Sequence, residues 1–252
     1  AVTRMSDLIK FPAFKGLTLL AGEEGLGRGV ATCGILEYQF SPEMKSRYYY
    51  TAFGEGMLVL TTFMYAVGNE YLISDAVRRL DALGVAGLVI KNVFHIRIPD
   101  SVIRFANVCK FPILLAEDTQ DNAFENLVLA FHSAVEMRAR ADMQQRTAEE
   151  LLQQDLDEAA VLRKTFQLYP SIGHHYRADY YLSKEPVDDE TWAAVEDVIR
   201  SAPPPFKGSC RYQNGIFLFH TLDNTCWAEI AENRDPTILK VQALLPRCAV
   251  GI

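Results

Sequence analysis

Seven residues in the first half of the chain stand directly after short apolar runs, where β-strands would end. Carboxylate, hydroxyl, ammonium and amide groups of this kind could together bind a small polar molecule with several hydrogen-bond donors and acceptors. In open α/β sheets, ligands bind outside the carboxyl ends of the strands. We therefore predict a ligand-binding site at this edge of a sheet. The candidate residues are Glu37, Tyr38, Thr61, Thr62, Lys91, Asn92 and Glu117.

Each candidate also has a purely structural interpretation. Thr61 and Thr62 could cap a following helix, and Tyr38 could pack in the core. Lys91 could pair with Glu117 or extend to solvent. An enzymatic alternative uses Lys91 and Glu117 as acid–base partners acting on a small metabolite.

Familiar catalytic and cofactor motifs are absent from the sequence. The glycine-rich segment 22–29 lacks the spacing of a dinucleotide- or phosphate-binding loop, so these glycines are expected to form a turn. Five dispersed cysteines show no CxxC pair and no histidine at zinc-ligand spacing. We expect no cofactor, no metal site and no disulfide framework. The aromatic segment 48–53 could stack on a planar ligand, although packing or an interface is the expected use.

The elements that must position the candidate residues follow from hydrophobic periodicity. Residues 1–135 alternate β-rich runs with helix-period segments, which predicts an α/β domain with a mainly parallel sheet and helices on both faces. Runs 57–61 and 87–90 are apolar throughout, as strands buried on both faces require. Segments 72–83 and 102–109 have helical periodicity. The predicted strands are 17–20, 30–36, 57–61, 87–90 and 112–115.

The second half of the chain has a different pattern. Residues 136–168 favour a helical connector with a solvated surface, and a dimer-forming signalling helix is the alternative. Residues 169–252 then predict the order β-α-β-β-α-β, which is typical of a ferredoxin-like α+β domain. Within it, Asp188 or Asp189 could cap a helix, and Asn214-Gly215 indicates a hairpin.

Composition narrows the class of protein. The net charge of −7 and the pI near 5.3 argue against a nucleic-acid-binding surface on this chain. No apolar run approaches the roughly 20 residues that a membrane span needs, so we expect a cytoplasmic protein. The terminal apolar run 248–252 predicts a strand and a second domain that is cut short.

Three segments, taken together in this order and spacing, resemble the N-terminal domain of PucR-type (purine catabolism regulator) transcription regulators. They are Gly56-Met-Leu-Val-Leu-Thr-Thr62, Leu83-Gly-Val-Ala-Gly-Leu-Val-Ile-Lys91 and Phe111-Pro-Ile-Leu-Leu-Ala-Glu117. The resemblance implies a sensor for a small-molecule effector, with purine-degradation metabolites as the named case. It also implies a homodimer, and a DNA-binding helix-turn-helix domain that this chain lacks.

The later part of the chain looks like the middle domain of the same family, which is related to GGDEF cyclases. At the turn that carries the acidic GGDEF residues in a cyclase, this chain has Gln213-Asn-Gly-Ile-Phe217. Without carboxylates to hold divalent ions, cyclase activity has no physical basis there. The resemblance therefore predicts a signal relay, and a purely structural dimerisation module is the alternative.

Overall fold

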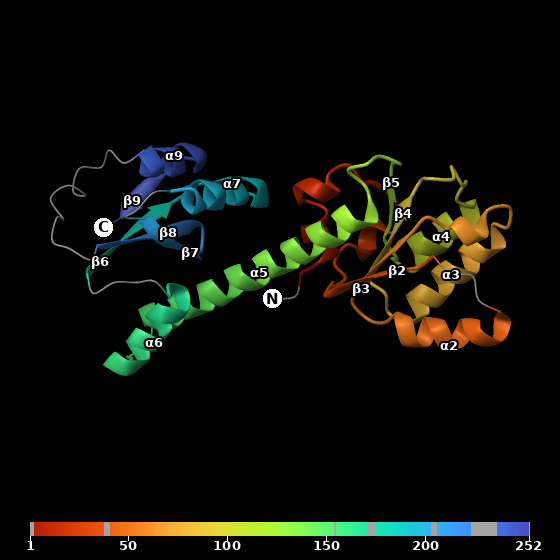
Figure 1. The fold of residues 1–252 in the computed structure, drawn as a ribbon, viewed down its shortest axis with the longest axis horizontal. Helices are drawn as coiled ribbons and strands as arrows, with labels where there is room; N and C mark the ends of the chain where they lie inside the picture. The colour runs from red at the N-terminus through yellow and green to blue at the C-terminus, as the bar shows by residue number, and fades with distance from the viewer. Residues whose placement is uncertain are drawn as a thin grey trace. The chain divides into compact units, whose positions relative to one another are not determined.

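The computed structural model (Figure 1) describes residues 3–37, 41–153, 155–170, 175–202, 206–222 and 236–251. The chain divides into two units, Ala1–Arg138 and Ala139–Ile252. The elements of the first unit are α1 (Met5–Leu8), η1 (Pro12–Phe14), β1 (Thr18–Ala21), η2 (Glu23–Gly25), β2 (Thr32–Ile35), α2 (Pro42–Ala52), β3 (Met57–Thr61), η3 (Met64–Ala66), α3 (Tyr71–Ala82), β4 (Gly87–Lys91), α4 (Asp100–Val108), β5 (Ile113–Ala116) and the start of α5 (Phe124–Gln153). The second unit holds the end of α5 followed by α6 (Glu158–Leu168), β6 (His175–Leu182), α7 (Asp189–Arg200), β7 (Phe206–Tyr212), β8 (Gly215–Leu222), α9 (Pro236–Leu244) and β9 (Ala249–Gly251).

The sheet of the first unit has the strand order β1-β5-β4-β3-β2. Strands β2 to β5 pair in parallel, each with the next along the chain, while β1 pairs antiparallel with β5. Crossover helices α2, α3 and α4 join the parallel strands, as parallel pairing requires. The predicted α/β class with a mainly parallel sheet is confirmed.

Helices cover both faces of this sheet (Figure 1), and side-chain alternation along the strands decides which core each residue joins. Val59 and Leu88 pack with buried residues of α2, α3 and α4. Leu60 and Val89 point the other way and pack with α1 and with Phe131 of α5. Uniformly apolar strands are therefore required here, because neither face of β3 or β4 meets water.

Glycines of segment 22–29 form the turn between β1 and β2, as expected. Gly22 has φ +76°, and a Cβ placed on it would lie 2.0 Å from the backbone oxygen of Phe111. A Cβ on Gly25 would lie 1.9 Å from the Lys110 oxygen. The turn thus packs directly on the backbone that leads into β5, and only glycine fits this approach.

The aromatic segment 48–53 forms the end of helix α2 and its C-cap residue Phe53, and packing explains most of it. Tyr49 and Phe53 are buried in the core that lies under α2, α3 and α4. The Tyr48 and Phe53 rings meet edge to face, with centroids 5.5 Å apart. Tyr50, by contrast, is 80% exposed. Most of this aromatic surface therefore belongs to the core rather than to a stacking platform for a ligand.

The second unit has an antiparallel sheet of order β7-β8-β6-β9, with α7 and α9 packed on one face. Its chain order β6-α7-β7-β8-α9-β9 is the predicted β-α-β-β-α-β order. Asp188 caps α7, since its carboxylate accepts a hydrogen bond from the Thr191 amide at 2.7 Å.

The hairpin turn lies one residue earlier than the Asn214-Gly215 pair suggested. Tyr212 pairs with Gly215, so Gln213 and Asn214 form the two-residue loop. Asn214 Nδ2 donates to the backbone oxygens of Ser183 (2.7 Å) and Glu185 (2.6 Å), which anchors the turn to the loop after β6. Gly215 is instead a strand residue whose missing side chain leaves room for the Tyr180 ring.

The predicted connector is not solvated along its whole length. Ala148 of α5 is buried against Tyr169 and Phe219 of the second unit. Gln144 Nε2 donates to the Ser209 oxygen of β7 at 3.2 Å. The last turns of α5 therefore cover the face of the second sheet opposite α7 and α9, and the contacts compensate for the low apolar content of this segment.

A buried charged group lies on the two central strands of the second sheet. Asp179 is 1% exposed, and its carboxylate accepts from Arg177 Nε at 2.7 Å. His220 Nε2 lies 3.2 Å from the other carboxylate oxygen, and the His220 ring is equally buried. Because Arg177 and His220 are cross-strand partners, the sheet itself holds the three side chains together.

Among the described residues, no helix is both long enough and apolar enough to cross a membrane.

Candidate functional site

The register of the parallel strands brings the predicted site residues to one edge of the first sheet. Ile35 pairs with Leu60, Thr61 with Ile90, and Lys91 with Ala116, so β2 to β5 end at nearly the same level. The candidates that end these strands or follow them at this edge are Glu37, Thr61, Thr62, Lys91, Asn92 and Glu117. Tyr38 lies outside the described residues.

Glu37 and Thr62 are brought into direct contact. The Glu37 carboxylate accepts hydrogen bonds from the Thr62 amide and from Thr62 Oγ1, the latter at 2.7 Å. Thr62 Oγ1 also accepts from the Met64 amide at 3.2 Å. The contact ties the end of β2 to the end of β3, and both side chains remain partly exposed. Sequence reasoning placed these residues at one edge but did not pair them.

Thr61 makes a hydrogen bond to the backbone at the end of β3. Its side chain is fully buried, and Oγ1 accepts from the Phe63 amide at 2.9 Å. Phe63 has φ +53°, an uncommon conformation for a bulky residue. Thr61 thus has a structural role in the turn after β3, but it does not cap η3 as the sequence had suggested. Thr62, which is partly exposed, is the more accessible of the two threonines.

Lys91 pairs with a carboxylate that the sequence analysis had not selected. Its Nζ lies 3.2 Å from Asp118 Oδ1, with the two side chains 17% and 46% exposed. Glu117 is exposed, and its backbone oxygen accepts from Asn122 Nδ2 at 2.9 Å. Asn92 donates its amide to Ala116, which extends the β4–β5 ladder by one bond.

The candidates thus form two separate contacts, Glu37 with Thr62 and Lys91 with Asp118. Thr61 belongs to neither contact, because it shares the face of Val59 under α2 to α4, whereas Lys91 shares the face of Val89 under α5. A single ligand contacting both pairs would have to extend along the carboxyl ends of β2 to β5.

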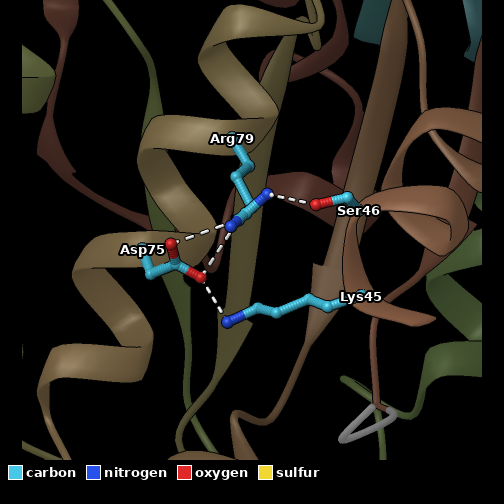
Figure 2. A network of polar contacts seen from close by, with 4 residues as sticks. All are labelled: Lys45, Ser46, Asp75 and Arg79. Carbon is cyan, nitrogen blue, oxygen red and sulfur yellow. Dashed lines mark hydrogen bonds and ion pairs between the residues drawn. The ribbon is translucent and has the colours of Figure 1, made fainter. Parts of the chain in front are cut away.

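An ion-pair network joins α2 to α3 (Figure 2). Asp75 of α3 accepts from Arg79 Nε at 3.1 Å and pairs with Lys45 of α2. The Arg79 guanidinium also donates to Ser46 Oγ at 3.3 Å. Burial alone would raise the pKa of Asp75, but the two cations outweigh it, and the pKa lies below its ordinary value.

Replacing Asp75 with asparagine is expected to destabilise the protein by about 1 kcal/mol at pH 7. Because folding lowers the pKa of Asp75, the ionised carboxylate stabilises the fold above about pH 4. That contribution is lost as the pH falls through the lowered pKa. Urea unfolding at several pH values measures the difference between the two proteins, which should shrink only below about pH 4.

Asp100→Asn is the matched control, because Asp100 pairs with Arg97 through side chains that are 77% and 80% exposed. Its effect should be close to zero at every pH. If the difference in stability between Asp75→Asn and the unchanged protein stayed constant until acid unfolds the protein, lost packing rather than lost charge would be responsible.

Tyr65 is partly buried, its hydroxyl is fully buried, and it interacts electrostatically with the Glu37 carboxylate. Burial raises the pKa of Tyr65 well above its ordinary value, and the neighbouring Tyr49, Glu37 and Asp75 raise it further. Its phenol therefore stays neutral and is a potential hydrogen-bond donor. No feature of the sequence distinguishes Tyr65 from the other tyrosines.

A cavity of about 690 Å³ opens at the opposite edge, beyond the amino-terminal ends of β2, β3 and β4. Arg28 lies on its wall and is fully engaged with the protein. It donates to the oxygens of Val85 (2.8 Å) and Cys109 (2.9 Å) and pairs with Asp81 at 2.8 Å. These bonds tie the turn after β1 to the helix ends around β4 and β5, which is a structural role.

Within the described ranges, no cluster of three or more His, Cys, Asp or Glu side chains could hold a metal ion. The polar groups at the carboxyl edge offer hydrogen-bond donors, hydrogen-bond acceptors and charges.

Comparison with known proteins gives consistent results for the first unit. Residues 7–135 match the model of the purine catabolism regulatory protein-like (PucR) family. The chain is also 28% identical over 109 residues to the purine catabolism regulatory protein of Bacillus subtilis (strain 168). That alignment covers 43% of this chain and 19% of the relative. Because the family match spans just over half of the chain, this chain belongs to the purine catabolism regulatory protein-like family.

Proposed function

We propose that this chain is the effector-sensing and signal-relay region of a cytoplasmic transcription regulator that acts as a homodimer and binds DNA through a domain outside the chain. The observation that carries the proposal is the family match over residues 7–135, which spans nearly all of the first unit. The name of the B. subtilis relative describes a regulatory protein of purine catabolism. Purine-degradation metabolites are therefore the first class of effector to test.

The carboxyl edge of the first sheet is the proposed effector site. Its two contacts, Glu37 with Thr62 and Lys91 with Asp118, join partly exposed groups that a polar ligand could take over without leaving a buried charge unpaired. An effector shifts a regulator between two states only by its difference in affinity for them. The ends of β2 and β4 would thus have to differ between the two states.

A catalytic role for Lys91 and Glu117 has less support. Lys91 Nζ lies 3.2 Å from Asp118, so an acid–base pair with Glu117 would first require this ion pair to open. We propose that the first unit binds its ligand without turning it over. For the second unit we propose a relay related to GGDEF cyclases but without their activity, since amide side chains form the Gln213–Asn214 turn.

Support for the homodimer comes from α6. Leu162 and Phe166 on this helix are 52% and 49% exposed, and Val161 beside them is 38% exposed. Adjacent exposed apolar side chains of this kind are typical of protein contact surfaces.

Thermal-shift screening of the chain with uric acid, allantoin, allantoate, nucleobases and amino acids tests the sensing function. We expect at least one compound to stabilise the protein, and we expect Lys91→Gln to weaken its affinity by about tenfold or more, because a charged hydrogen bond is lost. Calorimetric titration of both proteins measures the ratio.

Lys110→Gln is the matched control. Lys110 also makes one lysine–carboxylate pair, with Glu24 at 2.8 Å, but it follows α4 near the amino-terminal edge of the sheet. Equal loss of affinity in both variants would place the ligand elsewhere. Chemical conversion of the stabilising compound would instead favour an enzyme, and a stable dimer that binds none of the compounds would favour a structural module.

A further inference from the structure

A second cavity, of about 480 Å³, lies entirely within the second unit. Its walls come from the later part of α5, the end of α6, the end of α7 and the middle of β7. The described lining residues include three arginines and one glutamate. The lining is therefore basic, although the whole chain has a net charge of −7. The four charged residues are Arg140, Glu196, Arg200 and Arg211.

Tyr169, also on the cavity wall, has a buried hydroxyl that lacks a partner. Its side chain is 4% exposed, and its ring stacks on Phe219 with centroids 5.8 Å apart and planes 9° apart. Within the described part of the chain, no group accepts from or donates to the Tyr169 hydroxyl. A buried hydroxyl without a hydrogen bond is unfavourable, so such a group in a native protein calls for an explanation.

The fold makes specific room for this ring. A Cβ placed on Gly208 would lie 2.4 Å from the Tyr169 ring, so only glycine allows the ring to lie against β7. The pairing of β7 with β8 is also irregular between Phe206 and Gly208. Bulges of this kind occur frequently beside binding sites, where they redirect the strand.

The charges around the cavity favour an anion. Arg140 projects from α5 as an exposed side chain, Arg200 pairs with Asp197 at 3.0 Å, and Arg211 lies over the Trp192 ring at 4.4 Å. Burial raises the pKa of Glu196, although all three arginines oppose this shift. Protonation of Glu196 on ligand binding would further reduce repulsion of an anion.

We propose that this cavity binds a small metabolite through a phosphate or carboxylate group, with the arginines as its ionic partners and the Tyr169 hydroxyl as a hydrogen-bond donor. Guanidinium groups match both oxyanions in geometry and charge. The ligand would give the hydroxyl the partner that it lacks. This site is separate from the sheet edge of the first unit, and it would allow the second unit to respond to a ligand of its own.

Calorimetric titration of the full chain with sodium pyrophosphate and with sodium malonate tests the proposal and distinguishes the two oxyanions. Sodium chloride at matched ionic strength is the reference. We expect saturable binding of at least one anion, and about a tenfold or greater loss of affinity in Arg140→Gln. Arg146→Gln should leave the affinity unchanged, because Arg146 is an exposed residue of the same helix outside the cavity lining.

Tyr169→Phe separates a binding role from a structural one. Removing a buried hydroxyl that lacks a partner should leave the melting temperature of the unliganded protein unchanged or higher, while the affinity for the anion falls severalfold. The proposal is overturned if neither anion binds beyond the salt reference. It is also overturned if Arg140→Gln and Tyr169→Phe bind normally, or if Tyr169→Phe melts earlier without ligand. Variants of Lys91 should not alter this binding.

Discussion

Gly22→Ala should lower the free energy of unfolding of the first unit by about 2–5 kcal/mol. Left-handed backbone at φ +76° costs a residue with a Cβ about 1–2 kcal/mol. The new methyl group would also overlap the backbone oxygen of Phe111 at 2.0 Å, and the shift that relieves this overlap costs about 1–3 kcal/mol. Urea unfolding followed by far-ultraviolet circular dichroism measures the sum.

Gly16→Ala is the matched control. Gly16 has no atom within 4 Å of an added Cβ and does not have a positive φ. Its replacement should be neutral or slightly stabilising, because alanine restricts the unfolded chain more than glycine does. If Gly22→Ala lowered the free energy of unfolding no more than Gly16→Ala does, this turn would not pack tightly against the residues that lead into β5.

Asp179→Ala should destabilise the second unit by about 1–3 kcal/mol, the usual result of leaving hydrogen-bonding groups in a protein interior without their partner. Arg177 and the buried His220 would both lose the carboxylate between them. Fluorescence of Trp192, which is buried in the core under α7, should report the loss during urea unfolding.

Glu185→Ala is the control for that measurement. Glu185 pairs with Arg247 through side chains that are 49% and 77% exposed, so the expected loss is below about 1 kcal/mol. Similar effects of Asp179→Ala and Glu185→Ala would mean that water reaches the strand pair and that the charged group is not buried in solution.

Most of the fold was predictable because the hydrophobic period of each segment and its amino-acid composition indicate the same secondary structure. Strand β3 begins and ends where the apolar run 57–61 does, and glycine follows α3 at position 84 with φ +74°. Helix α2 was not predicted, because its tyrosines have the composition of a strand and its buried core residue, Tyr49, does not by itself make a helical stripe. Tertiary packing decides its conformation.

The location of the site was predictable from the sequence, but the contacts between its side chains were not. The sequence identifies strand ends, whereas the partner of each side chain depends on register across the sheet. Lys91 pairs with Ala116, so alternation brings Asp118, two residues further on, to the side of Lys91 and turns Glu117 away. The partnership of Glu37 with Thr62 likewise requires β2 and β3 to be aligned first.

The antiparallel edge strand β1 has a consequence for the order in which the protein folds. Strands β2 to β5 each pair with a neighbour that follows closely in the chain, so these pairs can form as the ribosome releases them. Strand β1 leaves the ribosome first, yet its partner residues 113–115 emerge almost a whole domain later. Until then β1 has no partner, and the apolar residues of α1 and η1 can cover only the incomplete sheet of β2 to β4. Closure of this edge is therefore a late and slow step, and the nascent chain is most prone to aggregate just before it.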